Sequence, residues 1–437
     1  MPSPSLDVAR RCWSTGDLAG ADRECEALLA QSPGVTEAWL LRSRVALMQG
    51  RRPEAGELLA AGYEATRDPT FAGELTTFHV QNREPAAARR WLREWESGGA
   101  DRGAIELGRG LCDWLEGEHA GAVEHFHSAC RLNPGNPRYP LRLARALVSL
   151  GRTAEAAACL GALPPAALGS GGHELLALCT FDLSGHDEAL AIVRRGLGHH
   201  PDSPDLNFLD VALGELGGSP RGGAEASLRL DNERNLVRWE SFRYAREVGA
   251  DAHWHALVTS VLEQAIEDAP PGGLSCEFGV YQGLSLRFIA ERTNGPVHGF
   301  DSFQGLPEAW KAGEGAGSYS AGNHLPRVPQ NVTLHPGWFE ETLPNFVADA
   351  AAPMSLLHID CDIYSSTATV LRHVRPLLRP GTVVAFDEYL GYPGYREHEF
   401  RAWQEFAVAH GIEYEYLAFN LGARKAALRI LGFGRER

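Results

Sequence analysis

The 437-residue sequence lacks the features that mark several classes of protein. It has no run of about 18 apolar residues of the kind that crosses a membrane, and it has no long basic run. Acidic residues outnumber basic ones by 56 to 41, which gives a formal net charge of −15. Because a negative surface repels both phosphate backbones and anionic lipids, we expect neither nucleic acid nor membrane as a partner.

Cysteine pairs and phosphate-binding motifs are also missing. The eight cysteines are scattered without a C-x-x-C pair, and most lie in apolar patterns typical of buried, reduced thiols. The glycine-containing stretch EFGVYQG (277–283) does not match the dinucleotide motif G-x-G-x-x-G, and no G-x-x-x-x-G-K-[ST] loop occurs. The first residues, MPSPSLDVARRCW, contain no apolar signal-peptide core, so we expect a cytoplasmic location.

Six segments of the first half repeat one pattern, seen most clearly in GDLAGA, GRRPEA, GEHAGA and GRTAEA. Glycine is suited to end a first helix, alanine lets a second helix approach closely, and a proline twelve residues later in three units ends that helix. The pattern resembles tetratricopeptide repeats over residues 5–220, which implies an α-helical repeat domain rather than an irregular bundle. The alanines are spaced by 34, 33, 34, 34 and 33 residues: Ala21, Ala55, Ala88, Ala122, Ala156 and Ala189.

The repeats are followed by a stretch rich in glycine and proline, GELGGSPRGG. Residues 231–248 then predict a helix that joins two domains or covers a site. We therefore expect a tetratricopeptide-like domain over 1–220, a helical linker over 221–250 and a second domain over 251–437. Stacked repeats present a concave surface suited to a protein or peptide partner, and they could equally make the protein a homodimer.

The second domain alternates short apolar strands with helices. This order predicts a Rossmann-like α/β fold, with a parallel sheet between helices and a C-terminal antiparallel hairpin. Ligands of such sheets bind at the carboxyl ends of the strands, and four of the five parallel strands end in an acid. The predicted strands are 274–280, 297–303, 331–337, 354–362 and 382–389, with the hairpin at 414–420 and 425–431.

The stretch LSCEFGVYQGLSLR (274–287) is followed by an acid, Asp301, at the next predicted strand end. Two acids separated by a glycine turn resemble class I S-adenosylmethionine-dependent methyltransferases. In such a site, Gly279 and Gly283 would allow a ligand to approach the backbone, and Glu277 would face the positive end or the hydroxyls of the donor. Asp301 is placed to accept hydrogen bonds from a ribose diol.

Four further motifs make the resemblance more specific: FDSFQGLPEAW (300–310), LHPGWFEETLP (334–344), LLHIDCDIYSST (356–367) and VVAFDEYLGYPG (384–394). Together they resemble the macrocin O-methyltransferase family over about residues 250–437. These bacterial enzymes methylate sugar hydroxyls of natural products. The resemblance places the donor site on Glu277, Gly279, Tyr281, Gly283, Ser285, Asp301, Ser302, Trp338 and Asp360.

The resemblance also implies a divalent ion, usually Mg²⁺, held by Asp360, Asp387 and Glu388. Converging carboxylates are the hard oxygen ligands that Mg²⁺ prefers. The family more often has Asp at the last position, so Glu388 departs from its pattern. The alternative is that Asp387 and Glu388 form ion pairs with Arg396 or Arg424.

The expected reaction is in-line transfer of a methyl group to a substrate oxygen activated by Asp360 or the metal cluster, with His398 as second choice. His358 is predicted to be a core residue, and the Gly/Ser-rich segment 313–324 is either a lid or a plain loop. The predicted substrate is a natural product, either a sugar or a molecule bound to a carrier or peptide. Two alternatives remain: a peptide or protein methyltransferase that uses the repeats for docking, and a non-catalytic repeat scaffold with a degenerate methyltransferase domain.

Overall fold

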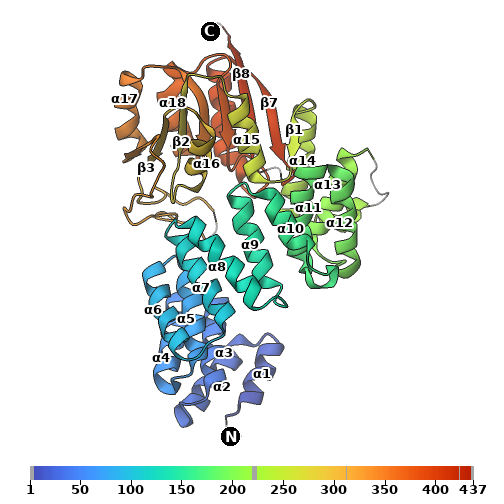
Figure 1. Cartoon of the computed structure of the whole chain (residues 1–437), viewed down its shortest axis with the longest axis vertical. Helices are drawn as coiled ribbons and strands as arrows, with labels where there is room; N and C mark the ends of the chain where they lie inside the picture. The colour runs from blue at the N-terminus through green and yellow to red at the C-terminus, as the bar shows by residue number, and fades with distance from the viewer. Residues whose placement is uncertain (1–3, 219–223, 312, 423, 435–437) are drawn as a thin grey trace. The chain divides into compact units, whose positions relative to one another are not determined.

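A computed structural model of the chain describes residues 4–218, 224–311, 313–422 and 424–434 (Figure 1). The chain divides into two compact units, residues 1–140 and 141–437. Helix α9 (Arg138–Ser149) contains the boundary between them. Within the described ranges, no helix is both long and apolar enough to cross a membrane.

The first unit consists of helices that pack in consecutive pairs, as the repeat pattern predicts. Small apolar clusters join each pair to the next, and one such cluster brings Phe71, Leu75 and Phe78 together. The helices are α1 (Leu6–Ser14), α2 (Leu18–Gln31), α3 (Thr36–Met48), α4 (Arg52–Thr66), α5 (Pro69–Gln81), α6 (Pro85–Ser97), α7 (Arg102–Leu115) and α8 (His119–Leu132).

The repeated residues have the structural roles that the sequence predicts. All six repeated alanines are completely buried. The four glycines that begin the clearest segments, Gly16, Gly50, Gly117 and Gly151, have φ between 73° and 79°, a backbone conformation that glycine adopts without steric cost. In the third repeat Arg83 takes this position at φ 59°, so one repeat holds a non-glycine residue in the left-handed region.

The last repeats belong to the second unit together with the sheet domain. One apolar core contains Val193 and Leu209 from the repeats, Trp239 and Phe242 from α14, and Leu421 from the sheet domain. The helices of this part are α10 (Thr153–Gly161), α11 (Gly169–Ser184), α12 (His186–His199), α13 (Pro204–Leu216) and α14 (Glu233–Val248), with short 3₁₀ turns at Pro165–Ala167 and Ala224–Leu228.

A carboxylate on α11 fixes the start of the sheet domain. The two oxygens of Asp182 accept hydrogen bonds from the backbone N–H groups of Ala256 and Leu257 at 2.6 and 3.0 Å. The hydroxyl of Ser260 donates a third hydrogen bond to Asp182 at 2.6 Å. These bonds satisfy backbone donors where helix α15 (Val258–Asp268) begins, so the last repeats are built into this unit by polar contacts as well as by the core.

The sheet has eight strands in the order β1-β7-β8-β6-β5-β2-β3-β4. The five predicted parallel strands and the antiparallel hairpin β7–β8 are confirmed, and β8 pairs with β6 in antiparallel fashion. Strand β1 was not predicted, because three residues are too short to show an alternating pattern. The strands are β1 (His253–His255), β2 (Leu274–Phe278), β3 (Val297–Asp301), β4 (Val332–Pro336), β5 (Met354–Ile359), β6 (Val383–Phe386), β7 (Ile412–Asn420) and β8 (Ala426–Phe433).

Helices cover both faces of the sheet, as predicted for this fold class. On one face, Phe278 and Phe300 of the strands share a core with Val370 and Trp403 of the helices. On the other face, residues of α15 and α16 pack on Val297, Leu356 and Val383. The remaining helices are α16 (Leu284–Arg292), α17 (Phe339–Asp349), α18 (Tyr364–Val374) and α19 (Glu399–Ala409), with 3₁₀ turns at Arg375–Leu377 and Tyr395–Glu397.

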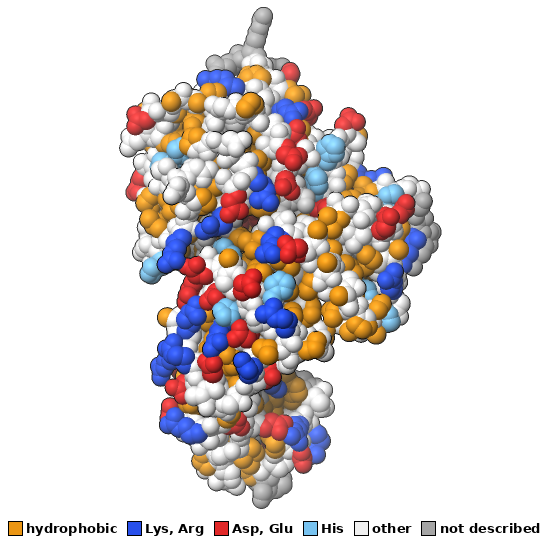
Figure 2. Space-filling view, viewed as in Figure 1, with side chains coloured by type: hydrophobic (Ala, Val, Ile, Leu, Met, Phe, Trp, Pro, Cys, Tyr) orange, Lys and Arg blue, Asp and Glu red, His pale blue; other side chains and the backbone are white. Residues whose placement is uncertain are grey.

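The state of the cysteines and the distribution of surface charge can be compared with the composition that predicted them. The eight cysteines all lie within the described residues and form no disulfide bond, and five of them are buried. On the face shown in Figure 2, acidic and basic side chains are interspersed. The described residues on that face form no broad basic surface.

Candidate active site

A cavity of about 510 Å³ lies at the carboxyl ends of the parallel strands, where ligands bind in sheets of this kind. Segments that follow β2, β3, β4, β5 and β6 form its walls, so residues far apart in the sequence meet there. Eight of the predicted site residues line it: Gly279, Tyr281, Asp301, Ser302, Trp338, Asp360, Asp387 and Glu388.

The glycine loop after β2 is shaped mainly by the backbone. Gly279 has φ 93°, and a Cβ at this position would collide with the carbonyl oxygen of Asp360, which directly follows the neighbouring strand β5. Gly283, at φ 74°, is the N-cap residue of α16 and does not line the cavity. A ligand was predicted to approach the backbone closely at Gly279, but the atom that does so is the carbonyl oxygen of Asp360. Gly283 serves to start helix α16.

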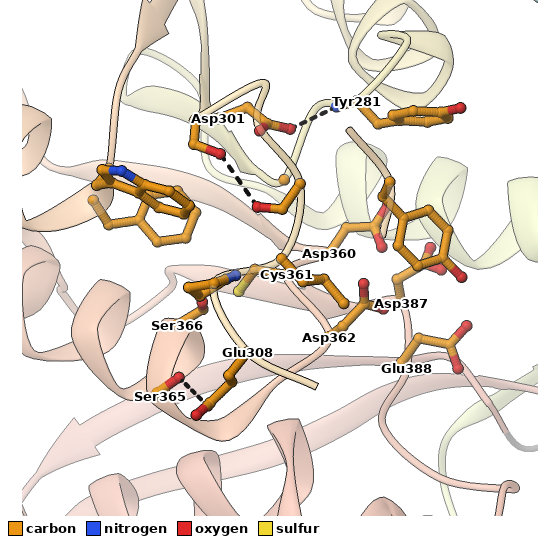
Figure 3. Close-up of a pocket in the computed structure, with 18 of the residues that line it drawn as sticks. Tyr281, Asp301, Glu308, Asp360, Cys361, Asp362, Ser365, Ser366, Asp387 and Glu388 are labelled. Atoms are coloured by element: carbon orange, nitrogen blue, oxygen red, sulfur yellow. Dashed lines mark hydrogen bonds between the residues drawn. The ribbon is translucent and has the colours of Figure 1, made fainter. Parts of the chain in front are cut away.

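Asp301 holds this loop in place. One of its carboxylate oxygens accepts hydrogen bonds from the backbone N–H groups of Val280 and Tyr281 at 2.8 and 2.7 Å (Figure 3). The other accepts one from Phe303 at 2.7 Å. A carboxylate has about four acceptor positions, so one remains for a ligand. The predicted contact with a ribose diol is thus limited to one hydrogen bond from this side chain.

Glu277 differs from its predicted place in the donor site. It lies within β2, is completely buried and does not line the cavity. One carboxylate oxygen is 2.8 Å from Nδ1 of His358, which stands opposite it on β5. The other has no hydrogen-bond partner among the described residues. Glu277 and His358 are thus a buried pair beneath the site, which agrees with the prediction for His358.

Four acidic side chains gather on one side of the cavity: Asp360, Asp362, Asp387 and Glu388 (Figure 3). Burial raises the pKa of Asp360 to about 7, although His358 and Lys425 oppose this shift. Burial and the charge of Glu388 likewise raise the pKa of Asp362 to about 7. Near neutral pH each of these two carboxyl groups is therefore partly protonated. Asp362, at φ 63°, is a functional candidate that the sequence analysis did not select.

The other two acids, Asp387 and Glu388, form ion pairs with basic side chains. Lys425 contacts Oδ1 of Asp387 directly, and Nε of Arg424 donates to Glu388 at 2.9 Å. Among the described residues, no three His, Cys, Asp or Glu side chains are arranged to hold a metal ion together. The predicted set of Asp360, Asp387 and Glu388 does not fit Mg²⁺, because two of its three members are already paired with cations. The alternative pairing of Glu388 with Arg424 is the one that the structure contains.

A second acid missed by the sequence analysis, Glu399, links the loops that carry these residues. It is completely buried in the first turn of α19. Its two oxygens accept hydrogen bonds from the backbone N–H groups of Asp362 and Glu388, both at 3.1 Å. Burial and the charge of Asp362 raise its pKa well above the usual range for glutamate. Its neighbour in sequence, His398, does not line the cavity.

His398 packs instead among aromatic rings. Its ring centre lies 6.4 Å from that of Tyr392 and 6.5 Å from that of Trp310. Burial lowers the pKa of this histidine. The structure therefore does not bring the second-choice base to the acids, and Asp360 is the predicted catalytic residue that lines the cavity.

The segment predicted as a lid or a plain loop contributes Tyr319 to the cavity wall. The Tyr319 hydroxyl donates to Glu314 at 2.7 Å. Backbone hydrogen bonds between Leu306 and residues 317 and 318 tie the segment to the loop after β3. The segment thus forms part of the site rather than a separate surface loop.

A second cavity of about 300 Å³ adjoins the first and shares Tyr281, Asp360 and Asp387 with it. Apolar residues of α15 and α16, among them Leu262 and Phe288, form part of its wall, and Ser285, a predicted donor contact, lines this cavity and not the first. Ser149, the last residue of α9, also lines it. The repeat part of the second unit therefore reaches the neighbourhood of the site.

Comparisons with protein families agree with this architecture. A family model described as "Methyltransferase domain" matches residues 276–389. Two models described as "Tetratricopeptide repeat" match residues 7–69 and 114–179. The matched ranges correspond to the sheet that carries the cavity and to the helical pairs.

Three relatives are similar to part of this chain. Mycinamicin III 3''-O-methyltransferase of Micromonospora griseorubida is 30% identical in an alignment of 188 residues that covers 36% of this chain and 69% of the relative. A tetracenomycin-C 4'-O-methyltransferase acting on a dimethoxy-rhamnosyl derivative, from Streptomyces olivaceus, is 30% identical over 29% of this chain and 57% of its own length. Demethyldecarbamoylnovobiocin O-methyltransferase of Streptomyces niveus is 26% identical over 45% of this chain and 85% of its own length.

These findings establish a methyltransferase, and its relatives are O-methyltransferases named for natural products. They do not show membership of the narrower macrocin O-methyltransferase family, which the motifs resemble. The chain belongs to the methyltransferase family of mycinamicin III 3''-O-methyltransferase, and it carries tetratricopeptide repeats before the methyltransferase domain.

Proposed function

We propose that this protein transfers a methyl group from S-adenosylmethionine to a hydroxyl oxygen of a bacterial natural product, either on a sugar or on a molecule bound to a carrier or peptide. The observation that carries the proposal is the acid-lined cavity at the strand ends. Its carboxyl groups suit a ligand that bears a sulfonium and an ammonium group. The O-methyltransferase names of the relatives support oxygen as the acceptor atom.

The residues of the cavity fit this donor, whose sulfonium supplies an activated methyl group. Asp301 keeps one acceptor position for a ribose hydroxyl. Trp338 lines the cavity and offers an aromatic face for the adenine. Asp360 lies at the junction of the two cavities, where the reacting atoms would meet.

We also assign Asp360 as the base that acts on the acceptor hydroxyl. With a pKa of about 7, its carboxylate can take the proton of a substrate hydroxyl near neutral pH. Removal of that proton raises the nucleophilicity of the oxygen as it approaches the methyl group. The backbone contact between Gly279 and Asp360 keeps the donor loop and this base at a constant separation.

Calorimetry with S-adenosylmethionine tests the proposal. We expect the wild type to bind and Gly279→Val to lose binding, because the added side chain collides with the Asp360 carbonyl and cannot adopt φ 93° without strain. Gly315→Val is the matched control, since a Cβ at Gly315 meets open space. Thermal melting would verify that the Gly279 variant is folded. A wild type that binds no donor would contradict the proposal.

A peptide or protein acceptor docked on the repeats is the second candidate. The observation that favours it is the first unit, a compact set of repeats with its own cores. Removal of residues 1–136 would abolish methylation of such an acceptor and spare a small-molecule acceptor. Dimerisation through the repeats stays a prediction, and the non-catalytic alternative is not retained because the chain belongs to a family of enzymes.

A further inference from the structure

Two consecutive basic residues, Arg424 and Lys425, precede β8, and Lys425 lines the second cavity. The backbone N–H groups of Arg424 and Lys425 both donate to the side-chain oxygen of Asn420 at 2.9 Å. The carbonyl of Arg424 in turn accepts hydrogen bonds from Tyr389 and Leu390 at 2.7 and 3.2 Å. Since Tyr389 directly follows Glu388, the backbone itself places the turn before β8 against the loop that carries the acids.

The side chains complete an arrangement of matched charges. Lys425 contacts Asp387, and Arg424 is a bidentate partner of Glu388. Only 14% of the Lys425 side chain and 20% of the Asp387 side chain are exposed, so water screens this pair weakly. Behind Asp387, Nε2 of His358 lies 3.7 Å from the same carboxylate oxygen. One carboxylate oxygen of Asp387 therefore faces two basic side chains, Lys425 and His358, which line the second cavity together with it.

We propose that methyl transfer in this chain needs no divalent metal, because Lys425 and Arg424 hold the positive charge at Asp387 and Glu388 that a metal ion would otherwise supply. The inference rests on the proposed function for its reaction. The structural part of the inference is that Lys425 and Arg424 already neutralise Asp387 and Glu388. This part depends only on the contacts described above.

The two basic residues act as positioning residues. A small divalent ion needs carboxylate oxygens that point at it without a competing cation. To bind here, the ion would have to displace the ammonium group of Lys425 and the guanidinium group of Arg424. The backbone of these two residues is held by hydrogen bonds to Asn420 and Tyr389. Lys425 and Arg424 instead keep Asp387 and Glu388 fixed in the cavity wall, where they present hydrogen-bond acceptors to the acceptor molecule.

Manganese binding, measured by electron paramagnetic resonance on the full chain, tests the inference without reference to activity. We expect no stoichiometric Mn²⁺ binding to the wild type and one bound ion in the double variant R424M/K425M, in which the acids lose their partners. Arg429→Met, on the strand that follows this turn, is the matched control, because Arg429 pairs with Asp268 and Glu415 outside the cavity. This control should bind no ion.

Activity with a chelator provides the second measurement. Extensively chelated wild type should keep its full initial rate, and added Mg²⁺ should not change it. Stoichiometric Mn²⁺ binding to the wild type, or a rate lost with chelator and restored by Mg²⁺, would overturn the inference. So would a double variant that melts as a folded protein yet binds no ion. If the wild type neither binds S-adenosylmethionine nor Mn²⁺, the proposed function fails while the structural part of the inference stands.

Discussion

At the scale of single residues, burial decides which groups in the cavity carry charge. Asp360 and Asp362 are acids of ordinary type whose pKa values rise to about 7 because burial disfavours their charged form. In the unfolded chain both would ionise near pH 4. The native state therefore holds two protons over a pH range in which the unfolded state has released them.

This difference predicts how stability depends on pH. For these groups the contribution to the free energy of unfolding is present below about pH 4 and is lost as the pH rises through about 7, because the native state binds more protons than the unfolded state. Asp360→Asn removes one such group, so its melting temperature should fall less than that of the wild type between about pH 5 and pH 8. Glu397→Gln, which changes an exposed acid, should keep the wild-type slope. Equal slopes for Asp360→Asn and the wild type would contradict the pKa assignment.

The sequence predicted which residues line the cavity better than it predicted the role of each residue. Gly279, Asp301 and Asp360 line the cavity as expected, since strand ends of a parallel sheet meet at one edge. Glu277 was assigned to the donor from its sequence neighbours, but it is completely buried within β2 and pairs with His358. The predicted strand already included Glu277, but the partner across the sheet comes from β5, and sequence neighbours do not show which strand lies alongside.

At the scale of elements, the first turn of α19 controls the two loops that carry the acids. Glu399 accepts a backbone hydrogen bond from each loop, so a single side chain sets the separation of Asp362 and Glu388. The sequence GYREHEF contains this residue beside His398, but nothing in the pattern distinguishes the buried acid from the exposed Glu397.

Replacing Glu399 tests this role. Glu399→Ala leaves two buried backbone N–H groups without partners, which should lower the free energy of unfolding by about 2–4 kcal/mol. Urea denaturation measures this change, and calorimetry should show weaker donor binding because the loops are no longer held. Glu397→Ala, on the exposed turn before α19, should stay within about 0.5 kcal/mol of the wild type. Equal stability of the two variants would argue against the role of Glu399.

At the scale of the whole molecule, the compact units do not follow the boundary between repeats and sheet. The last repeats share a core with Trp239, Phe242 and Leu421, and Asp182 binds the backbone that leads into α15. The expected boundary near residue 220 follows the change of pattern in the sequence. The compact units divide instead at residues 140 and 141.

Truncation at two positions distinguishes these boundaries. Removal of residues 1–136 keeps α9 intact and should leave a folded protein that binds S-adenosylmethionine. Removal of residues 1–220 should destabilise the remainder by at least about 3 kcal/mol, because Trp239 and Phe242 lose the apolar surface that covers them. Thermal melting of the two truncated proteins compares them directly. Equal melting temperatures would show that the sheet domain is stable without the last repeats.

The sequence by itself determined the helical repeats, the alternation of strands and helices and the acids at the strand ends, because all three follow from local periodicity and from residue type. Only the tertiary structure decided which charges meet. Lys425 and Arg424 reach Asp387 and Glu388 because β8 is inserted next to β6, and Glu399 reaches both acidic loops from a helix that follows them. Electrostatic interactions depend on distance and on the exclusion of water, and both are set by the packing of elements that are far apart in the chain.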